Sequence, residues 1–322
     1  MEDKRLKQRP LAGRQLAVAV MVGGLSCAAA AAGQTDWRWA LCTVPVGVLL
    51  SVPLLKKAEK GPLFSGAGGG VLAVLYGGWA VVLMVCALSR AAARVQLVSG
   101  GQSSSGWILL LLALPLLWMG WGKLEAFLRT AEIFWLAEVA VLALVFLLSV
   151  PQIEWRWLWG QMGDWRKSAL AMGEILATGV FALPYIYRTD RKPGRLGRGA
   201  AWLAALGVTA AVLAGVTAGI LSHVVAEQLQ EPFFVAAGVL GKSARGEGLL
   251  SALWLLPDLI YIGLLSRTWG KNHWPAAAVA ASLILAAAGV GNAVPASVRC
   301  IGSVILLILT LVIPRGEGKD SG

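Results

Sequence analysis

Residues Thr130 to Val150 read TAEIFWLAEVAVLALVFLLSV, an apolar run interrupted by only two charged side chains, Glu132 and Glu138. A helix needs roughly 17 to 25 such residues to cross about 30 Å of hydrocarbon. A helix also bonds its backbone polar groups within the segment, as a lipid environment requires. The run therefore predicts a transmembrane helix.

Similar runs extend over most of the chain, of which 57% is hydrophobic and 14% is charged. About a quarter of the residues in a soluble domain are charged, so this composition excludes a soluble globular enzyme. We expect an all-α integral membrane protein with about ten transmembrane helices. The predicted spans are 15–32, 37–55, 69–92, 105–120, 130–150, 168–187, 199–221, 248–266, 275–290 and 296–313.

The order of the spans predicts a single membrane domain, 1–322, with an internal repeat. The first five-helix repeat is 15–150 and the second is 168–313. Because each repeat has an odd number of spans, the two must be inverted relative to each other in the membrane. Residues 1–14 and 314–322 are expected to be cytoplasmic tails.

The net charge of +11 is the excess of 28 Lys and Arg residues over 17 Asp and Glu residues, and the basic residues lie mostly in short clusters between the spans. This distribution is typical of membrane topology signals, not of the single basic face of a nucleic-acid-binding protein. With a cytoplasmic N-terminus, nineteen of the 28 basic residues lie on the cytoplasmic side. The other nine, among them Arg90, Arg94 and Arg299, lie on the opposite side. This excess predicts that both termini are cytoplasmic.

Cysteine and histidine give no sign of a metal site or of an enzyme. The cysteines are single residues inside apolar spans, without a Cys-x-x-Cys pair, which is typical of small buried side chains. His223 and His273 lie in different connections, on opposite faces of the predicted topology. We therefore expect no metal, no cofactor and no catalytic residue. The cysteines are Cys27, Cys42, Cys86 and Cys300.

Carboxylic acids inside the spans are the strongest functional candidates, because a charge at bilayer depth is costly and usually faces a partner or a cavity. Glu132 follows Arg129 by three residues, which favours an ion pair along the helix. Glu138 lies deeper in its span and would either join a buried polar network or line a cavity. The candidates are Glu132, Glu138, Glu174 and Asp258.

Glycines flank the acid of the sixth span, in the sequence MGEILATGVF from Met172 to Phe181. The first span contains a corresponding pair of glycines, in VGGLS from Val22 to Ser26. Glycine weakens a helix and lets a ligand approach the backbone, but small residues also let membrane helices pack closely. Both interpretations stay open. Helices broken at these matching positions would form a midplane site whose half-helix ends suit a zwitterionic amino acid. Its candidate residues are Gly23, Gly24, Ser26, Gly173, Glu174, Thr178 and Gly179.

Two further residues have less specific surroundings. Asp258 follows Pro257, and a proline kink would open the backbone beside the acid. A role in helix packing is as well supported as a role in ligand binding. Tyr76 precedes Gly77 and Gly78, and would either line a cavity or pack as an ordinary tyrosine.

The segment GKLEAFLRTAEI, from Gly122 to Ile133, and the pair Gly173-Glu174 followed by Pro184-Tyr185 are similar in order and spacing to motifs of one known family. Through these motifs the chain resembles the B subunit of spore germinant receptors, within the amino acid-polyamine-organocation transporter superfamily. The likeness extends over most of the chain. Together with the acids above, it gives the expected structural or coupling residues Glu125, Arg129, Glu132, Glu138 and Asp258.

The resemblance implies a LeuT-like fold, a five-plus-five inverted repeat in which helices one and six are broken. It also implies a receptor subunit that binds a small germinant, typically an L-amino acid, in a spore inner membrane or bacterial cell membrane. Its implied partners are the A-type and C-type receptor subunits. Two other hypotheses fit the same residues. One is a proton-coupled amino acid transporter with Glu174 or Asp258 as the proton carrier, and the other is a membrane scaffold whose glycines only pack helices.

Overall fold

The computed structural model describes residues 13–59, 67–98, 104–160, 162–181, 196–229, 231–240, 244–269 and 274–312. All regular structure in these residues is helical. Each predicted span coincides with one helix, with ends that differ by a few residues, and the last part of the sixth span, 182–187, lies outside the described residues. These helices are α1 (Gly13–Ala31), α2 (Trp37–Glu59), α3 (Ala67–Val98), α4 (Ser105–Trp121), α5 (Leu124–Ser149), α7 (Trp165–Phe181), α9 (Leu196–Leu221), α12 (Ala244–Ser266), α13 (Trp274–Ala287) and α14 (Ala296–Val312). Shorter helices are η1 (Val150–Gln152), α6 (Trp155–Leu158), α10 (His223–Gln228), α11 (Pro232–Leu240), η2 (Arg267–Trp269) and η3 (Val290–Ala293).

The helices have the length and surface of a membrane-embedded protein. By length and composition, four are long and apolar enough to cross a membrane, namely Trp37–Lys57, Gly69–Leu97, Leu124–Gln152 and Gly199–Leu221. Helices α1, α4, α13 and α14 contain shorter apolar stretches. Large apolar side chains also point outward, as expected where lipid replaces water. Examples are Leu49, Leu50, Leu111, Leu114, Leu136, Leu147 and Ile284.

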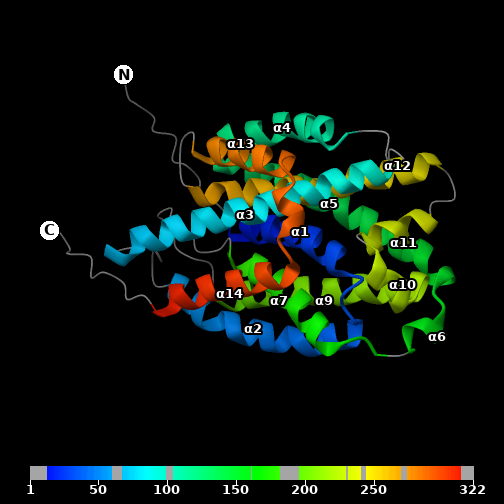
Figure 1. Ribbon diagram of the computed structural model, residues 1–322. Coiled ribbons are helices and arrows are strands. Elements are labelled where there is room, and N and C mark those ends of the chain that lie inside the picture. Colours follow the sequence, from blue (N-terminus) through cyan, green and yellow to red (C-terminus); the bar gives the residue numbers. More distant parts are fainter. Residues whose placement is uncertain are drawn as a thin grey trace, which may run out of the picture.

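Helix α1 lies at the centre of the bundle and packs on α5, α7, α9 and α12 (Figure 1). It is uninterrupted from Gly13 to Ala31, so the predicted break at Gly23 and Gly24 is wrong. A Cβ on Gly23 would lie 3.2 Å from Cα of Tyr261, and a Cβ on Gly24 would lie 2.6 Å from a methyl carbon of Leu206. The glycines thus let α12 and α9 approach α1 closely, and this packing stabilises the helix that their weak propensity disfavours.

Helix α7 is also uninterrupted, from Trp165 to Phe181, so the predicted break in the sixth span does not occur within the described residues. A Cβ on Gly173 would lie 2.9 Å from Sγ of Cys300 on α14. This glycine, like those of α1, sits at a close contact between helices. Without a break, no half-helix ends are exposed at these positions, and a binding site must be sought among side chains.

The helix pairs follow a regular scheme. Among the described residues, α1 packs on α7, α2 on α9, α3 on α12 and α4 on α13, so each of the first four helices contacts a helix five predicted spans later, whereas α5 and α14 have no comparable contact there. Other contacts recur in the same way. The pair α1–α5 corresponds to α7–α14, α1–α9 to α7–α2, and α3–α13 to α12–α4. The scheme is not complete, since the large α1–α12 contact has no comparable α7–α3 contact in the described residues.

The two ends of the bundle are held by different contacts. At one end, Lys57 Nζ donates to the carbonyl oxygens of Thr310 and Leu311, the latter at 3.1 Å. One hydrophobic cluster, which includes Leu16, Leu55 and Leu264, joins the start of α1 to the ends of α2 and α12 here. We call this the Lys57 end, and the opposite end, where α1 connects to α2, the Asp36 end.

Candidate functional site

A group of charged side chains lies inside the bundle, and we call it the central ionic cluster. Arg94 is 1% exposed, and Glu138 and Asp258 are 0% exposed. Charges buried to this extent are tolerated only when they are paired or serve a function. The cluster brings together α3, α5, α7, α12, α14 and the residue before α11. Its members are Arg90, Arg94, Glu138, Glu174, Glu231, Asp258 and Arg299.

Arg94 is the hub of the cluster. Its Nη1 lies 2.5 Å from Oδ2 of Asp258, and its Nε donates to Oε2 of Glu231 at 2.8 Å. The other carboxylate oxygen of Asp258 accepts a hydrogen bond from the hydroxyl of Ser26 on α1. Two predicted candidates, Ser26 and Asp258, are thus in direct contact. Helix α12 continues through Pro257, so no opened backbone accompanies the acid.

Glu174 on α7 is held by arginines. Nε and Nη2 of Arg299 donate to its two carboxylate oxygens at 2.6 and 3.2 Å, a bidentate arrangement that is among the stronger ion pairs in proteins. Nη1 of Arg90 lies 3.7 Å from Oε1 of the same acid, and Nη2 of Arg90 lies 3.6 Å from Sγ of Cys27. Glu174 is therefore a paired acid within the cluster, and its ligand-binding role stays a prediction.

Glu138 differs from the other acids of the cluster. Neither of its carboxylate oxygens has a hydrogen-bond partner within the described residues. The charges that act on it are those of Asp258 and Arg94, yet no ion pair joins it to Arg94 in the described structure. Nη2 of Arg94 likewise has no partner there. We call the Glu138 carboxyl and Nη2 of Arg94 the open pair.

The open pair places an acid and an arginine nitrogen, neither with a hydrogen-bond partner among the described residues, in the buried interior of the bundle. A buried polar group without a partner costs free energy, about 1–3 kcal/mol for a neutral group and more for a charge. A small molecule that carries both an anionic and a cationic group has a suitable hydrogen-bonding group for each member of the open pair. The other buried side-chain atoms with no partner among the described residues are Nε of Arg90, Nε1 of Trp254, Oγ of Ser89, Nε of Arg267 and Nε1 of Trp269.

The other predicted residues lie apart from this cluster. Tyr76 is fully buried, and its hydroxyl accepts a hydrogen bond from Thr310 at 3.0 Å, near the Lys57 end. Glu125, Arg129 and Glu132 lie in the first turns of α5. Glu132 accepts a hydrogen bond from Gln15 at 3.0 Å, and the expected ion pair with Arg129 does not occur in the described structure. Thr178 and Gly179 lie in α7, but the side chain of Thr178 and the surroundings of Gly179 are outside the described part of the structure.

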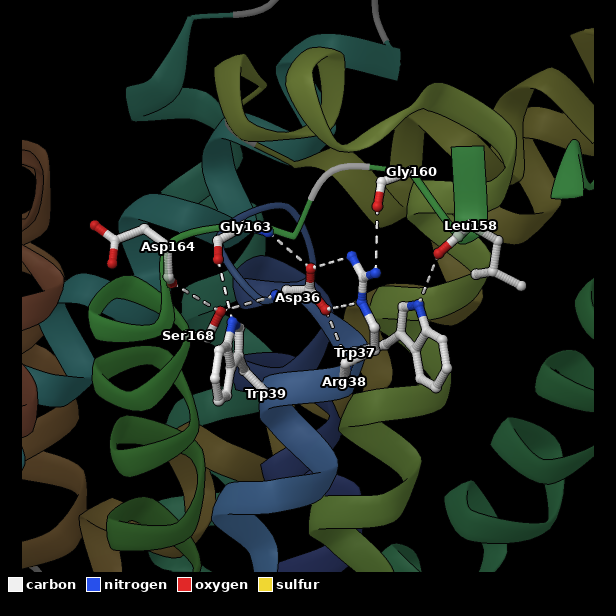
Figure 2. A network of polar contacts seen from close by, with 9 residues as sticks. All are labelled: Asp36, Trp37, Arg38, Trp39, Leu158, Gly160, Gly163, Asp164 and Ser168. Atoms are coloured by element: carbon white, nitrogen blue, oxygen red, sulfur yellow. Dashed lines mark hydrogen bonds and ion pairs between the residues drawn. The ribbon is translucent and has the colours of Figure 1, made fainter. Parts of the chain in front are cut away.

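A second polar network closes the Asp36 end (Figure 2). The carboxylate of Asp36 accepts hydrogen bonds from the backbone N–H of Arg38 at 2.9 Å and of Gly163 at 2.8 Å. The guanidinium of Arg38 adds two more, at 3.1 and 2.8 Å, and the backbone N–H of Asp36 donates to Ser168 at 2.9 Å. Burial raises the pKa of Asp36, but these bonds from Arg38 and Gly163 outweigh it and hold the pKa below its ordinary value. The network ties the α1–α2 connection to the segment that begins α7.

The arginines of the cluster, and Glu231, are the functional candidates that sequence reasoning missed. It counted Arg90, Arg94 and Arg299 on the side of the membrane opposite the cytoplasm, although Arg90 and Arg299 lie within the predicted spans 69–92 and 296–313. Helix α3 instead runs to Val98, and the side chains of Arg90 and Arg94 enter the bundle. The sequence did contain a signal for two of these arginines. Arg90 and Arg94 are four residues apart and so share a helix face, and acids inside the spans need counter-charges.

The described residues contain no group of three or more His, Cys, Asp or Glu side chains that could hold a metal ion. No protein-family model matches the chain, and no curated protein matches it. The function therefore has to follow from the chemistry of the central ionic cluster.

Proposed function

We propose that the chain is a membrane-embedded receptor subunit that binds a small zwitterionic solute, an L-amino acid, in the manner of a spore germinant receptor B subunit. The observation that carries this proposal is the open pair. In the binding pose we favour, Nη2 of Arg94 donates to the solute carboxylate and the carboxylate of Glu138 accepts from its ammonium group. Charge-assisted hydrogen bonds of this kind are about twice as strong as neutral ones.

The proposed fold is a ten-span, five-plus-five inverted repeat. Its support is the packing scheme, in which α1–α7, α2–α9, α3–α12 and α4–α13 are paired at a constant interval. Because α1 and α7 are continuous in the described residues, the solute would contact side chains of α3 and α5 in place of the unwound backbone of two broken helices. A small number of well-placed polar groups is enough to orient a small ligand.

The proposed setting is the inner membrane of a spore, or a bacterial cell membrane, with both termini in the cytoplasm. The Lys57 end would face the cytoplasm, since lysines gather there at Lys56, Lys57 and Lys123. The proposed partners are A-type and C-type receptor subunits, and the proposed role is not enzymatic. The solute would act by binding one conformation more tightly than another, and a partner would sense that change.

A proton-coupled amino acid transporter is the second candidate, and one observation favours it. Glu138 is a fully buried acid whose oxygens have no partner among the described residues, which is the situation of a group that exchanges protons. The earlier proton-carrier candidates are less suitable, because Glu174 is paired with Arg299 and Asp258 with Arg94.

The purified chain reconstituted in proteoliposomes distinguishes these functions. Each standard L-amino acid, radiolabelled, is tested for binding to the protein and for uptake into the vesicle lumen. Binding without uptake supports the receptor, and uptake that increases with an inward proton gradient supports the transporter. If folded, monodisperse protein binds none of the L-amino acids, both proposals are wrong and the result supports the membrane-scaffold hypothesis.

A further inference from the structure

We infer that Glu138 carries a proton in the unliganded protein and that it gives this proton to solvent when an amino acid binds. The first part stands on the central ionic cluster alone. The second part rests on the proposed function. The two parts are tested separately below.

The charge balance of the cluster supports the proton. Its described members comprise three arginines, Arg90, Arg94 and Arg299, and four acids. Asp258 and Glu231 are bonded to Arg94, and Glu174 is bonded to Arg299 with Arg90 nearby. Every arginine is therefore engaged with an acid other than Glu138. One ionised carboxylate without a counter-charge in a water-free interior is very costly, and protonation removes that cost.

Among the described side chains, no cation other than Arg94 acts on Glu138, and Arg267, which lies over the ring of Phe127 on α5, is at the Lys57 end. Helix α12 contributes Asp258, whose negative charge disfavours a second carboxylate, and also Tyr261, which packs on Gly23 of α1. Helix α3 contributes Arg94, and Glu231, just before α11, is already bonded to it. The described side chains of α1, α9, α11 and η1 include no charged residue. A proton is thus the smallest charge that can balance the site.

A bound zwitterion adds no net charge to the cluster, but its ammonium group would lie beside Glu138 and supply the counter-charge that this carboxylate lacks in the unliganded protein. The ammonium group of the solute is a hydrogen-bond donor and needs an acceptor. A protonated Glu138 presents an O–H there, which is a donor as well. The O–H bond of Glu138 breaks, its electron pair stays on the carboxylate, and the proton goes to bulk solvent. Proton and amino acid therefore compete for the same carboxyl, and acid conditions weaken binding.

Infrared difference spectroscopy of the solute-free protein tests the first part. The spectrum of wild type minus that of Glu138→Gln, at neutral pH, should contain the carbonyl stretch of one protonated carboxyl group. The spectrum of wild type minus that of Glu132→Gln should not contain it, since Glu132 lies at the Lys57 end beside Gln15. A carboxylate stretch assigned to Glu138 in place of the protonated band would overturn the inference. The same result with a dependence on sodium ions would indicate a bound metal cation instead.

Binding as a function of pH tests the second part, with the radiolabelled L-amino acid that the wild type binds most tightly. Affinity should fall about tenfold for each pH unit of acidification while the free carboxyl is protonated. Calorimetry in buffers of different ionisation enthalpy should detect one proton released per solute. Binding that is tight but independent of pH, with no proton release, overturns the linkage and leaves the proposed function intact. Absence of binding at every pH contradicts the proposed function itself, while the infrared result still decides the protonation.

Discussion

The Asp36 network and the central ionic cluster both join acids to arginines, yet they differ in how completely the polar groups are bonded. Both carboxylate oxygens of Asp36 accept two hydrogen bonds each, and the network closes one end of the bundle (Figure 2). In the cluster, the open pair remains unbonded within the described residues. A fully bonded network rigidifies a fold, whereas buried groups without partners need an explanation in function. The first region is therefore structural, and the second is the candidate site.

The largest effect is expected when the hub of the cluster is removed. Arg94→Met leaves Asp258 and Glu231 without their counter-charge, and loss of one partner from a buried ion pair typically costs about 3–5 kcal/mol. Thermal unfolding in detergent should detect a large fall in Tm. Arg156→Met is the matched control, because Arg156 pairs with Glu154 on the surface and its side chain is 76% exposed. Equal Tm values for the two variants would contradict the buried pairing.

A packing change near the cluster should have the next largest effect. Gly24→Val places methyl groups where Leu206 already lies, and overpacking of this kind costs about 1–3 kcal/mol. Gly78→Val is the control, since a Cβ there meets nothing within 4 Å. A fall in Tm for the Gly24 variant alone would show that close helix packing, without any change of charge, contributes to stability. A fall of the same size in both would show that the contact with Leu206 is not responsible.

The Asp36 network should contribute less to the free energy of unfolding than the two features above, and this contribution should depend on pH. Asp36→Asn loses charge-assisted bonds worth about 1–2 kcal/mol in total at neutral pH. Because the folded-state pKa of Asp36 lies below its ordinary value of 3.8, the contribution is complete above that value and is lost as the pH falls through the folded-state pKa. The difference in Tm between wild type and variant should therefore shrink in strong acid. A difference that stays constant would show that the charge of Asp36 is not involved.

The smallest effect is expected at an exposed pair. Lys167 pairs with Glu227, and burial does not protect this contact from solvent screening. Lys167→Ala should unfold at the wild-type temperature in physiological salt. A clear fall in Tm would mean that the Asp36 end extends its structural role to the surface between α7 and α10.

The sequence was sufficient to predict the helices but not the contacts between them. Apolar runs of suitable length located α2 and α9 closely, because this signal is local. The end of α3 was missed, since Arg94 has the local character of a loop residue and is held inside only by Asp258 and Glu231, which are far away in the chain. The breaks predicted in α1 and α7 failed for the same reason, as tertiary packing overrides the weak helix propensity of glycine. Glu138 was identified as a candidate, but its lack of a described partner could be seen only in three dimensions.

The most direct test of the candidate site compares two glutamates on the same helix, α5. Thermal unfolding is recorded with and without a saturating L-amino acid for wild type, Glu138→Gln and Glu132→Gln. A ligand present at a hundred times its Kd stabilises a folded protein by about 2.7 kcal/mol. We predict that the amino acid raises the Tm of wild type and Glu132→Gln but not that of Glu138→Gln. An equal rise in all three proteins would contradict the account, because the solute would then bind elsewhere.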